Sequence, residues 1–517
     1  MSAEPDEQGL LAAVTRYERA LTANDVAELD ALFAGGDATL RADGTAALVG
    51  HDHIARFRAR RGGAPARWLR RVHVRWISPD DALVVAEADR VDGHGLQTQW
   101  WRRQAGVWTV HAAHVSGGPS PARPGAGPDE QEDPATWRVR FAPEPAAAGP
   151  LAGLGVAVKD LIAVAGHAIG GGVPAWREQA RPEPANAPAL QRLLDAGAHV
   201  AGIAQTDELA FSLMGVNEHS GTPVNVNAPG RVPGGSTSGP AAAVAAGTAD
   251  LGLGTDTAGS LRVPGSYCGL HAWRPTHGVV PVDGVLPLAP AFDTVGLLTR
   301  DGATLRRAGL ELLRQQPTGR APQALLRSRT LMALATPETA LAVEAALAAL
   351  SVATGIPVRD VEVDPAAPAA WTTAFRTVQA AQAWAAHGAF LSANPDAVSP
   401  SVAARFRAGA AVTDEQVGAA RQESARVSAW LAQVLQQGWL CLPSTSTPAP
   451  RVDSTGEKFE LARGGTLQLT TLASQTGVPA LNLPWARVGT LPVGLCVLAP
   501  RGADADLLDL LRVLGPA

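Results

Sequence analysis

The sequence predicts an α/β protein with two units, a small α+β domain followed by a larger layered α/β core. Three observations support this prediction. The chain has 517 residues, which is long for a single domain. Residues 118–135 are rich in Pro, Gly and acids and lack apolar periodicity, as in an exposed linker. From about residue 151 onward, strand-like and helix-like segments alternate, so the expected units are residues 1–117 and 136–517.

The first unit is expected to begin with helix and to end with strands. Apolar residues recur at helical spacing over residues 10–33. Three later segments have the composition of strands: 72–77, 82–91 and 106–115. In the first of them, Val72, Val74 and Trp76 share one face, which predicts a half-buried strand.

Charge favours a small-molecule partner over nucleic acid or lipid. The formal net charge of -5 gives no general attraction to phosphate groups. The run from Arg56 to Arg75 contains eight arginines, with Trp68 and Trp76 interleaved, so nucleic-acid binding is one interpretation. However, residues 1–117 contain 14 arginines against 15 acids, and a solvated face or a lip that attracts carboxylates is the simpler interpretation. We expect no nucleic-acid partner.

Cysteine content and hydrophobicity indicate a cytoplasmic location. Cys268, Cys441 and Cys496 are far apart, odd in number and without CxxC spacing, so neither a disulfide framework nor a zinc site is expected. The acidic N-terminus differs from a signal peptide, and no stretch approaches the roughly 20 apolar residues of a membrane helix. We therefore expect no metal, no cofactor and no membrane partner.

Lysine is scarce in this chain. Of 43 basic residues, only Lys159 and Lys458 are lysine. Arginine stays protonated in proteins, whereas a lysine can lose its proton when it is desolvated or placed beside positive charge. Proton-accepting chemistry is one reason to retain a lysine in such a sequence, and chance survival is the other.

Three segments of the second unit together suit an active site: LGVAVKD around Lys159, GGSTSGPAAAVAAG around Ser236 and LGLGTDTAGSLRVP around Ser260. VAV is expected to be a buried strand that ends at Lys159, and the Ala-rich run after Gly239 to be a helix that begins near Ser236. LGLG is expected to be a second strand, followed by a turn. Glycine-containing turns expose a side chain and leave backbone N–H groups free, which suits a nucleophile and an oxyanion site.

These segments and the nearby histidines also allow two other interpretations. The Gly/Ser segment could be a flexible or phosphate-binding loop, but it lacks the GxxxxGK[ST] pattern. His219, His271 and His277 could supply a Ser-His-Asp triad. No GxSxG motif is present, however, and histidines near turns are more often solvated or structurally bonded.

The second unit resembles the amidase signature family. GGSTSG, followed by an Ala-rich helix and GTDTAGSLRVPGSYCG, is a pattern too long for a chance match. Further matches are FDTVGLLTR, LPSTSTPAP and TGVPALNLPWARVGTLPVGLCVLAP, so the resemblance extends from about residue 136 to the end. Ser236 and Ser260 are 24 residues apart, as are the family's bridging serine and nucleophile. The resemblance implies a layered core with a central mixed sheet flanked by helices.

The resemblance also implies a mechanism. Ser260 would attack an amide carbonyl, and Lys159, neutral at rest, would be the base. Ser236, which the family holds in a cis peptide after Gly235, would transfer protons between them. The oxyanion hole would consist of the backbone N–H groups of Thr257, Ala258, Gly259 and Ser260. Asp256 and Arg262 would support the loop.

The sequence departs from the common family pattern at two places. Thr237 and Ser238 stand where the family often has serine and serine or glycine. Ala258 stands where the family usually has glycine. If position 258 needs a positive φ angle, the methyl group of Ala258 would strain or alter the loop.

The first unit resembles the SnoaL-like cone fold, and more narrowly the small proteins associated with amidases of cyanuric-acid breakdown. The resemblance depends on the helix around Tyr17, on ATLRADG and on GVWTVHAAHVSG. Such cones enclose a pocket, and the resemblance places Tyr17, Arg41 and His114 in it. The other interpretation is that Tyr17 and His114 are hydrogen-bonded wall residues and Arg41 is a surface charge.

Together these features predict an amidohydrolase that cleaves a C–N amide bond through a seryl acyl-enzyme and releases ammonia or an amine. The first unit favours a small carboxylated amide, such as a carboxybiuret- or allophanate-like compound, as the substrate. The alternative is an ammonia-delivering amidotransferase-type subunit or a binding module that depends on a partner. Fusion of the two units would also serve dimerisation, so a homodimer is one expected assembly.

Overall fold

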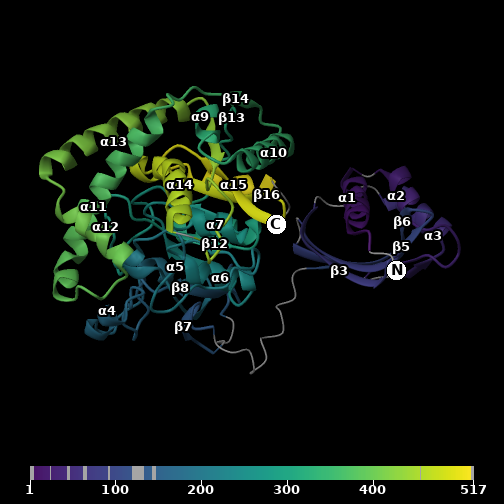
Figure 1. Cartoon of the computed structure of the whole chain (residues 1–517), viewed down its shortest axis with the longest axis horizontal. Coiled ribbons are helices and arrows are strands. Elements are labelled where there is room, and N and C mark those ends of the chain that lie inside the picture. Colours follow the sequence, from purple (N-terminus) through teal and green to yellow (C-terminus); the bar gives the residue numbers. More distant parts are fainter. Residues whose placement is uncertain are drawn as a thin grey trace. The chain divides into compact units, whose positions relative to one another are not determined.

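The structure is a computed structural model, which describes residues 5–23, 25–43, 47–61, 67–90, 93–118, 133–142, 147–454 and 456–513. The chain forms two compact units, one within Met1–Gly125 and one within Ala126–Leu514 (Figure 1). Most of the predicted linker, residues 119–132, lies outside the described residues. Each unit is described by itself.

The first unit is a small α+β domain, as predicted. Its described strands form a six-stranded sheet in the order β2-β1-β6-β5-β4-β3. Neighbouring strands are antiparallel except β1 and β6, which are parallel. The elements are α1 (Glu7–Ala23), α2 (Val26–Leu32), β1 (Leu40–Asp43), β2 (Ala47–Val49), α3 (His51–Arg61), β3 (Arg67–Ser78), β4 (Asp81–Arg90), β5 (Gly93–Gln104) and β6 (Val107–Gly118).

Two features of the first unit differ from the sequence prediction. The predicted helix 10–33 is divided into α1 and α2, because Asp25 has an extended backbone and its side chain accepts the Glu28 N–H. Strand β5 was not predicted. Its inward-facing side chains include the buried Gln97 and Gln99, so apolar and polar residues do not alternate as in an ordinary half-buried strand.

Strand β3 has the predicted alternation. Val72, Val74 and Trp76 pack against the core of the first unit. The side chains between them, His73 and Arg75, are exposed. This face pattern is the one expected of a half-buried strand.

The second unit contains an eleven-stranded mixed sheet among its described residues, in the order β14-β13-β15-β17-β16-β11-β12-β10-β8-β9-β7. The resemblance implied such a sheet. The strands are β7 (Trp137–Arg140), β8 (Gly155–Lys159), β9 (His199–Ala204), β10 (Leu251–Thr255), β11 (His271–Arg274), β12 (Val295–Thr299), β13 (Leu325–Arg327), β14 (Val358–Asp360), β15 (Trp439–Pro443), β16 (Ala480–Val488) and β17 (Leu491–Leu498).

Helices cover the sheet and form an outer layer (Figure 1). Those in the first half of the second unit are α4 (Pro174–Gln179), α5 (Pro188–Asp195), η1 (Glu208–Ala210), α6 (Ser238–Ala246), α7 (Arg262–Cys268) and α8 (Gly302–Leu313). The later ones are α9 (Arg329–Met332), α10 (Pro337–Thr354), α11 (Ala367–Ala393), α12 (Pro400–Ala410), α13 (Asp414–Leu435), α14 (Gly456–Thr476) and α15 (Asp504–Val513). In Figure 1, α11, α12 and α13 lie together on the outer side, away from the strands.

The centre of the sheet is buried on both faces. In β8, Val156 and Val158 lie in the largest apolar cluster, which also contains residues of α5 and α8. Ala157, on the opposite face of the same strand, lies in a second cluster with the alanines of α6. Continuous apolar strands such as VAV and LGLG are typical of a sheet that helices cover on both sides.

Helix α10 is also apolar. Among the described residues it is the one helix long and apolar enough to cross a membrane by length and composition, with a mean hydropathy of 1.2. Val343, Leu347 and Leu350 of this helix are buried in the largest apolar cluster of the second unit. Only 28% of this helix is buried inside the protein, and one such helix is weak evidence for a membrane span.

Candidate active site

The three predicted catalytic side chains lie at one edge of the sheet. Strands β8 and β10 are parallel neighbours, so their carboxyl ends lie side by side. Lys159 is the last residue of β8, and the turn to Ser260 follows β10. Ser236 precedes α6, and the N–H of the next residue, Thr237, donates to the carbonyl oxygen of Ser260 at 3.3 Å. The fold therefore places the three residues together.

Lys159 is completely buried among hydroxyl groups. Its Nζ donates to Ser236 Oγ at 2.8 Å, to Thr237 Oγ1 at 3.1 Å and to Thr255 Oγ1 at 2.7 Å. All three partners are neutral. Burial lowers the pKa of Lys159 to about 7, and the charges of nearby aspartates oppose this shift only in part. A lysine in this site can exchange a proton near neutral pH.

Ser236 is fixed on its backbone side. The Gly235–Ser236 peptide is cis. The Ser236 carbonyl accepts hydrogen bonds from Thr206 Oγ1 at 2.8 Å and from the Asp207 N–H at 3.3 Å. A Cβ atom at Gly235 would lie 2.3 Å from Asp207 Oδ2, so only glycine fits at this position. These contacts hold the Ser236 hydroxyl beside Lys159.

The turn before Ser260 offers three free backbone donors. The N–H groups of Thr257, Ala258 and Ser260 have no hydrogen-bond partner among the described residues. The Gly259 N–H, in contrast, donates to Asp256 Oδ1 at 2.9 Å. The prediction that Gly259 supplies an oxyanion donor is therefore wrong for this conformation, because its N–H is already bonded.

The positive φ angle in this turn belongs to Gly259 and not to Ala258. Gly259 has φ 126°, and a Cβ atom there would lie 3.0 Å from the Thr470 side chain. The φ angle of Ala258 is not positive. The methyl group of Ala258 therefore causes no backbone strain. It packs in an apolar cluster with Leu213 and Phe292.

Asp256 and Arg262 hold the turn, as the resemblance implied. The Asp256 carboxylate accepts bonds from Arg262 Nη2 at 2.8 Å and from the N–H groups of Gly259, Leu261 and Arg262. Arg274 lies on the same carboxylate and also donates to the Asp256 carbonyl. Although burial opposes it, this set of donors holds the pKa of Asp256 well below its usual range.

Helix α14 braces the turn from the other side. Thr470 Oγ1 donates to the Ala258 carbonyl at 2.5 Å, and the Thr470 carbonyl accepts from Arg262 Nη1 at 2.8 Å. Thr257 Oγ1 donates to Asp293 Oδ1 at 2.6 Å. The turn is therefore fixed by segments that lie far apart in the sequence.

Sequence reasoning missed several of these supporting residues, namely Asp207, Thr255, Arg274, Asp293 and Thr470. Asp293 lies in the FDTVGLLTR match, which signals its position but not its bond to Thr257. Arg274 is completely buried on β11, and a charged residue inside a strand is a signal for a specific partner. Nothing in the sequence around Thr470 indicates its contact with the catalytic turn.

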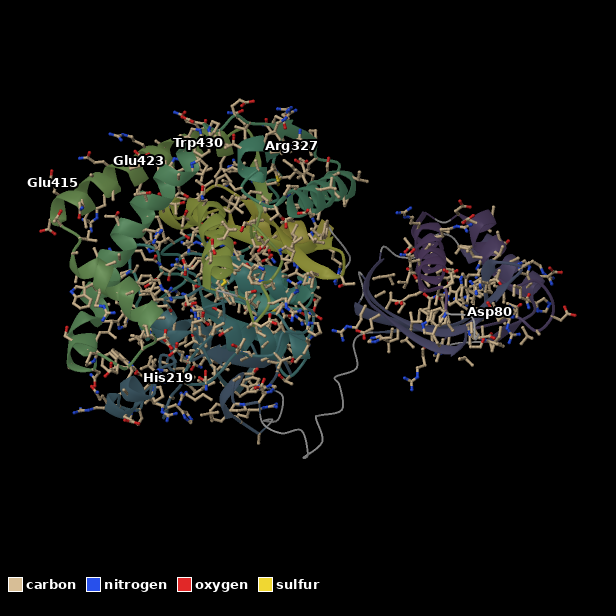
Figure 2. All side chains as sticks on the ribbon, in the orientation of Figure 1. Asp80, His219, Arg327, Glu415, Glu423 and Trp430 are labelled. Carbon is tan, nitrogen blue, oxygen red and sulfur yellow. The ribbon has the colours of Figure 1, made fainter. Side chains whose placement is uncertain are left out.

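The histidine alternative receives no support from the geometry. His219, which Figure 2 labels in the second unit, bonds the Ala397 carbonyl through Nε2 at 3.0 Å. His277 Nε2 bonds the Pro290 carbonyl at 2.9 Å. Within the described part of the chain, Ser260 has no histidine partner. Lys159 is the titratable group beside the serines.

The structure contradicts the placement of one of the three residues predicted to line a pocket in the first unit. Tyr17 is buried and accepts a hydrogen bond from Gln97 Nε2 at 2.8 Å. Arg41 is buried over the ring of Phe57. His114 is exposed, because its neighbour Ala113 faces the core and successive strand residues face opposite sides. His114 therefore does not line the interior with the other two.

The arginine run of the first unit is only partly a surface feature. Arg58 is buried, stacks on the Phe33 ring at 3.8 Å and donates to the Leu29 carbonyl. Residues 62–66 and several side chains of the run lie outside the described residues. The buried Arg58 belongs to the core and is unavailable to a nucleic-acid backbone.

The fold and this cluster define a class of protein, a hydrolase that acts on amides. The chain belongs to the amidase family, since the model of that family matches residues 133–508. The AtzH-like family model matches residues 8–119. Two folded units of different family therefore share one chain.

Individual relatives agree with this assignment. Amidase 1 of Arabidopsis thaliana is 32% identical over 409 residues, which cover 73% of this chain and 96% of the relative. A crystal structure of an amidase matches with a TM-score of 0.64 at 30% identity, over 71% of this chain and 85% of that chain. A structure described as a vestigial protein complex that reveals the evolutionary origins of an s-triazine catabolic enzyme matches with a TM-score of 0.64 at 25% identity, over 71% and 84%.

Proposed function

We propose that the second unit hydrolyses a small amide through a seryl acyl-enzyme, with Ser260 as nucleophile, Ser236 as proton bridge and Lys159 as base. The observation that supports this role most directly is the environment of Lys159. It is a buried amine whose pKa is lowered to about 7 and whose hydrogen-bond partners are hydroxyl groups, Ser236 among them. A general base works best when its pKa lies near the operating pH.

The first step forms the acyl-enzyme. Ser260 Oγ bonds to the amide carbon while its proton passes to Ser236 Oγ, and the Ser236 proton passes to Lys159 Nζ. The oxygen of the tetrahedral intermediate accepts bonds from the free N–H groups of Thr257, Ala258 and Ser260, where loss of one donor typically costs about 10²- to 10³-fold in rate. The C–N bond then breaks as the proton returns to the leaving nitrogen, which departs as ammonia or an amine.

The second step releases the product. Water attacks the acyl carbon and loses a proton along the same path to Lys159. The bond from Ser260 Oγ to the acyl carbon breaks, and that proton restores the Ser260 hydroxyl. The products are a carboxylic acid and free enzyme, so no cofactor is consumed.

The substrate we propose is a small carboxylated amide of the urea or biuret type. Two findings support it: the AtzH-like family match of the first unit and the likeness of the second unit to a structure described in connection with an s-triazine catabolic enzyme. Function is decided by the chemistry of the site and not by the fold alone, and turnover of such amides measures it directly.

The test is ammonia release by the purified full chain from ureas, biurets and aliphatic and aryl amides. Ser260→Ala is the blank, and Ser401→Ala, on the exposed side of α12, is the matched control. We expect activity in the wild type and in Ser401→Ala but none in Ser260→Ala. Intact mass measurement during turnover would show the acyl group in the wild type. Activity of Ser260→Ala equal to that of the wild type would refute the mechanism.

The same assay addresses the alternative of an ammonia-delivering subunit. A subunit that depends on a partner would release no ammonia from any amide by itself. Release by the purified chain alone from a simple amide would exclude that alternative.

A further inference from the structure

Three helices of the second unit bring arginine side chains together beside the catalytic region. Arg376 lies on α11, Arg405 on α12 and Arg463 on α14. Helix α11 packs against both α12 and α14. Burial lowers the pKa of Arg463 to about 10, and the charges of Arg405 and Arg376 act in the same direction. The three guanidinium groups therefore lie within electrostatic reach of one another.

Acidic partners for these arginines are few. Glu460 Oε1 lies 4.0 Å from Arg405 Nη1, and Glu460 Oε2 lies 3.3 Å from Arg463 Nη1. The Glu460 side chain is 61% exposed, whereas those of Arg405 and Arg463 are 17% and 11% exposed. In the part of the chain that the structure describes, the buried Nε atoms of both arginines have no hydrogen-bond partner. Such groups are costly to bury unless something else binds them.

The nearest buried acids do not supply the missing partner. The Glu208 carboxylate accepts bonds from the Ser399 N–H and Oγ and from the Glu218 N–H. The Asp207 carboxylate accepts bonds from the Gly215 N–H and Ser238 Oγ. Both carboxylates are hydrogen-bonded by neutral donors, and among the described residues neither forms an ion pair or hydrogen bond with an arginine of the cluster. Their charges act on Arg405 only through longer-range electrostatics.

One face of α14 connects this cluster to the catalytic turn. Arg463 and Thr470 are seven residues apart, which is two helical turns and a rise of about 10 Å along the same face. Thr470 bonds the Ala258 carbonyl of the turn. On the same face, Leu467 packs with Ala258 in an apolar cluster that Phe459 also contacts. A small molecule with its amide at Ser260 would extend along this face toward the arginines.

We propose that Arg405 and Arg463 bind the carboxylate of the amide substrate, while Arg376 adds positive charge at the rim. This assignment rests on the proposed amide hydrolysis and names the group that selects its substrate. Guanidinium groups bind carboxylates with two parallel hydrogen bonds, which fixes orientation as well as charge. The three arginines are thus specificity-determining residues and do not take part in bond breaking.

The test compares charged and neutral amides of the same shape. The substrates are the monoamides of malonic, succinic and glutaric acid, each paired with the neutral analogue in which a methyl ketone replaces the carboxylate. Ammonia release gives kcat/KM for each pair. Calorimetric binding of malonate, succinate and glutarate provides a second readout that does not depend on turnover.

The variants are Arg463→Gln and Arg405→Gln, with Arg463→Lys as the conservative change. Arg407→Gln, exposed on the same helix as Arg405, is the matched control. We expect either glutamine variant to lower kcat/KM for the charged amide about 10- to 100-fold, as loss of a hydrogen bond to a charged group does. The neutral analogue should change less than threefold, which also shows that the variant is folded.

The outcomes separate this proposal from the proposed function. Preference of the wild type for the charged amide, lost in both glutamine variants and partly kept in Arg463→Lys, supports the carboxylate site. Hydrolysis of both analogues at equal rates, or an equal loss on both in the variants, overturns the site while amide hydrolysis stands. Binding of dicarboxylates that depends on Arg463, without turnover of any amide, supports the site and overturns the proposed function.

Discussion

Lys159 and Asp256 are both completely buried at the ends of strands β8 and β10, yet their charges are treated in opposite ways. Lys159 has three hydroxyl partners, and its pKa is lowered to about 7. Asp256 has two arginine partners, and its pKa is held well below the usual range. Burial favours the neutral form of either group, so the difference lies in their partners. One region is suited to proton exchange and the other to permanent charge.

The largest effect should follow from making the charge at position 159 permanent. Lys159→Arg places a guanidinium, which cannot accept a proton, among the hydroxyl groups. We expect kcat/KM to fall about 10²- to 10⁴-fold, the contribution typical of general base catalysis. Ammonia release measures the loss, and circular dichroism should show an intact fold.

Lys458 provides the matched control, since it is the other lysine of the chain and is exposed on α14. Lys458→Arg should leave kcat/KM unchanged. More than a tenth of wild-type activity in Lys159→Arg would contradict the role of Lys159 as base.

Removal of the permanent negative charge at position 256 should lower the stability of the protein. Asp256→Asn leaves Arg262 and Arg274 buried without a counter-charge. We expect the free energy of unfolding to fall by about 3–5 kcal/mol, as when one partner of a buried ion pair is removed. Urea denaturation measures the change.

Asp453→Asn is the matched control for this substitution. Asp453 pairs with Arg451 at 2.8 Å, but both side chains are 63% exposed, and water screens such a pair. No measurable shift in Tm is expected. A loss in Asp256→Asn as small as in Asp453→Asn would mean that the buried cluster does not hold the turn.

The pH dependence of activity should follow Lys159 and not Asp256. The base must be neutral, so kcat/KM should fall about tenfold per pH unit below pH 7 and level off above it. Asp207 and Asp293, whose pKa values burial raises, act on Lys159 through their charges and modify the slope. Arg274 has its pKa lowered only to about 10, so the Asp256 cluster keeps its charge throughout this range. A flat profile from pH 5.5 to 9 would contradict the assignment.

The smallest effect is expected within the turn that joins the two regions. Ala258→Gly should change kcat/KM less than about fivefold, because Ala258 has no positive φ angle and glycine costs about 0.5–1 kcal/mol in place of alanine. Gly259→Ala should lower kcat/KM more, since its φ of 126° and its contact with Thr470 leave no room for a methyl group. Steady-state kinetics of the two variants measure the difference in kcat/KM. A larger loss in Ala258→Gly than in Gly259→Ala would mean that position 258, and not 259, restricts the side chain.

The fold of the second unit could be predicted because its signals are local. Val156 to Val158 and the LGLG run are continuous apolar strands, and the run after Gly239 is rich in alanine, the residue with the highest helix propensity. Lys159, Ser236 and Ser260 came from motifs and from the scarcity of lysine. In the structure Lys159 bonds Ser236 directly, and the backbone of Ser260 bonds the residue that follows Ser236.

What could not be predicted depends on long-range geometry. The bond that removes Gly259 from the free donors is made by the Asp256 side chain folding back along its own turn, which spacing does not reveal. The outward direction of His114 depends on strand register, and a shift of one residue reverses every side chain. The arginines at 376, 405 and 463 come from three helices, and no sequence pattern predicts their meeting.

The catalytic turn depends on α14, which is synthesised long after the turn itself. Arg262 donates a hydrogen bond to the carbonyl of Thr470, which lies 208 residues later in the sequence. A nascent chain that has left the ribosome as far as residue 300 holds the lysine and both serines but not the helix that fixes the turn. We therefore expect hydrolytic activity to arise only once α14 has been made, because the turn lacks these bonds before then.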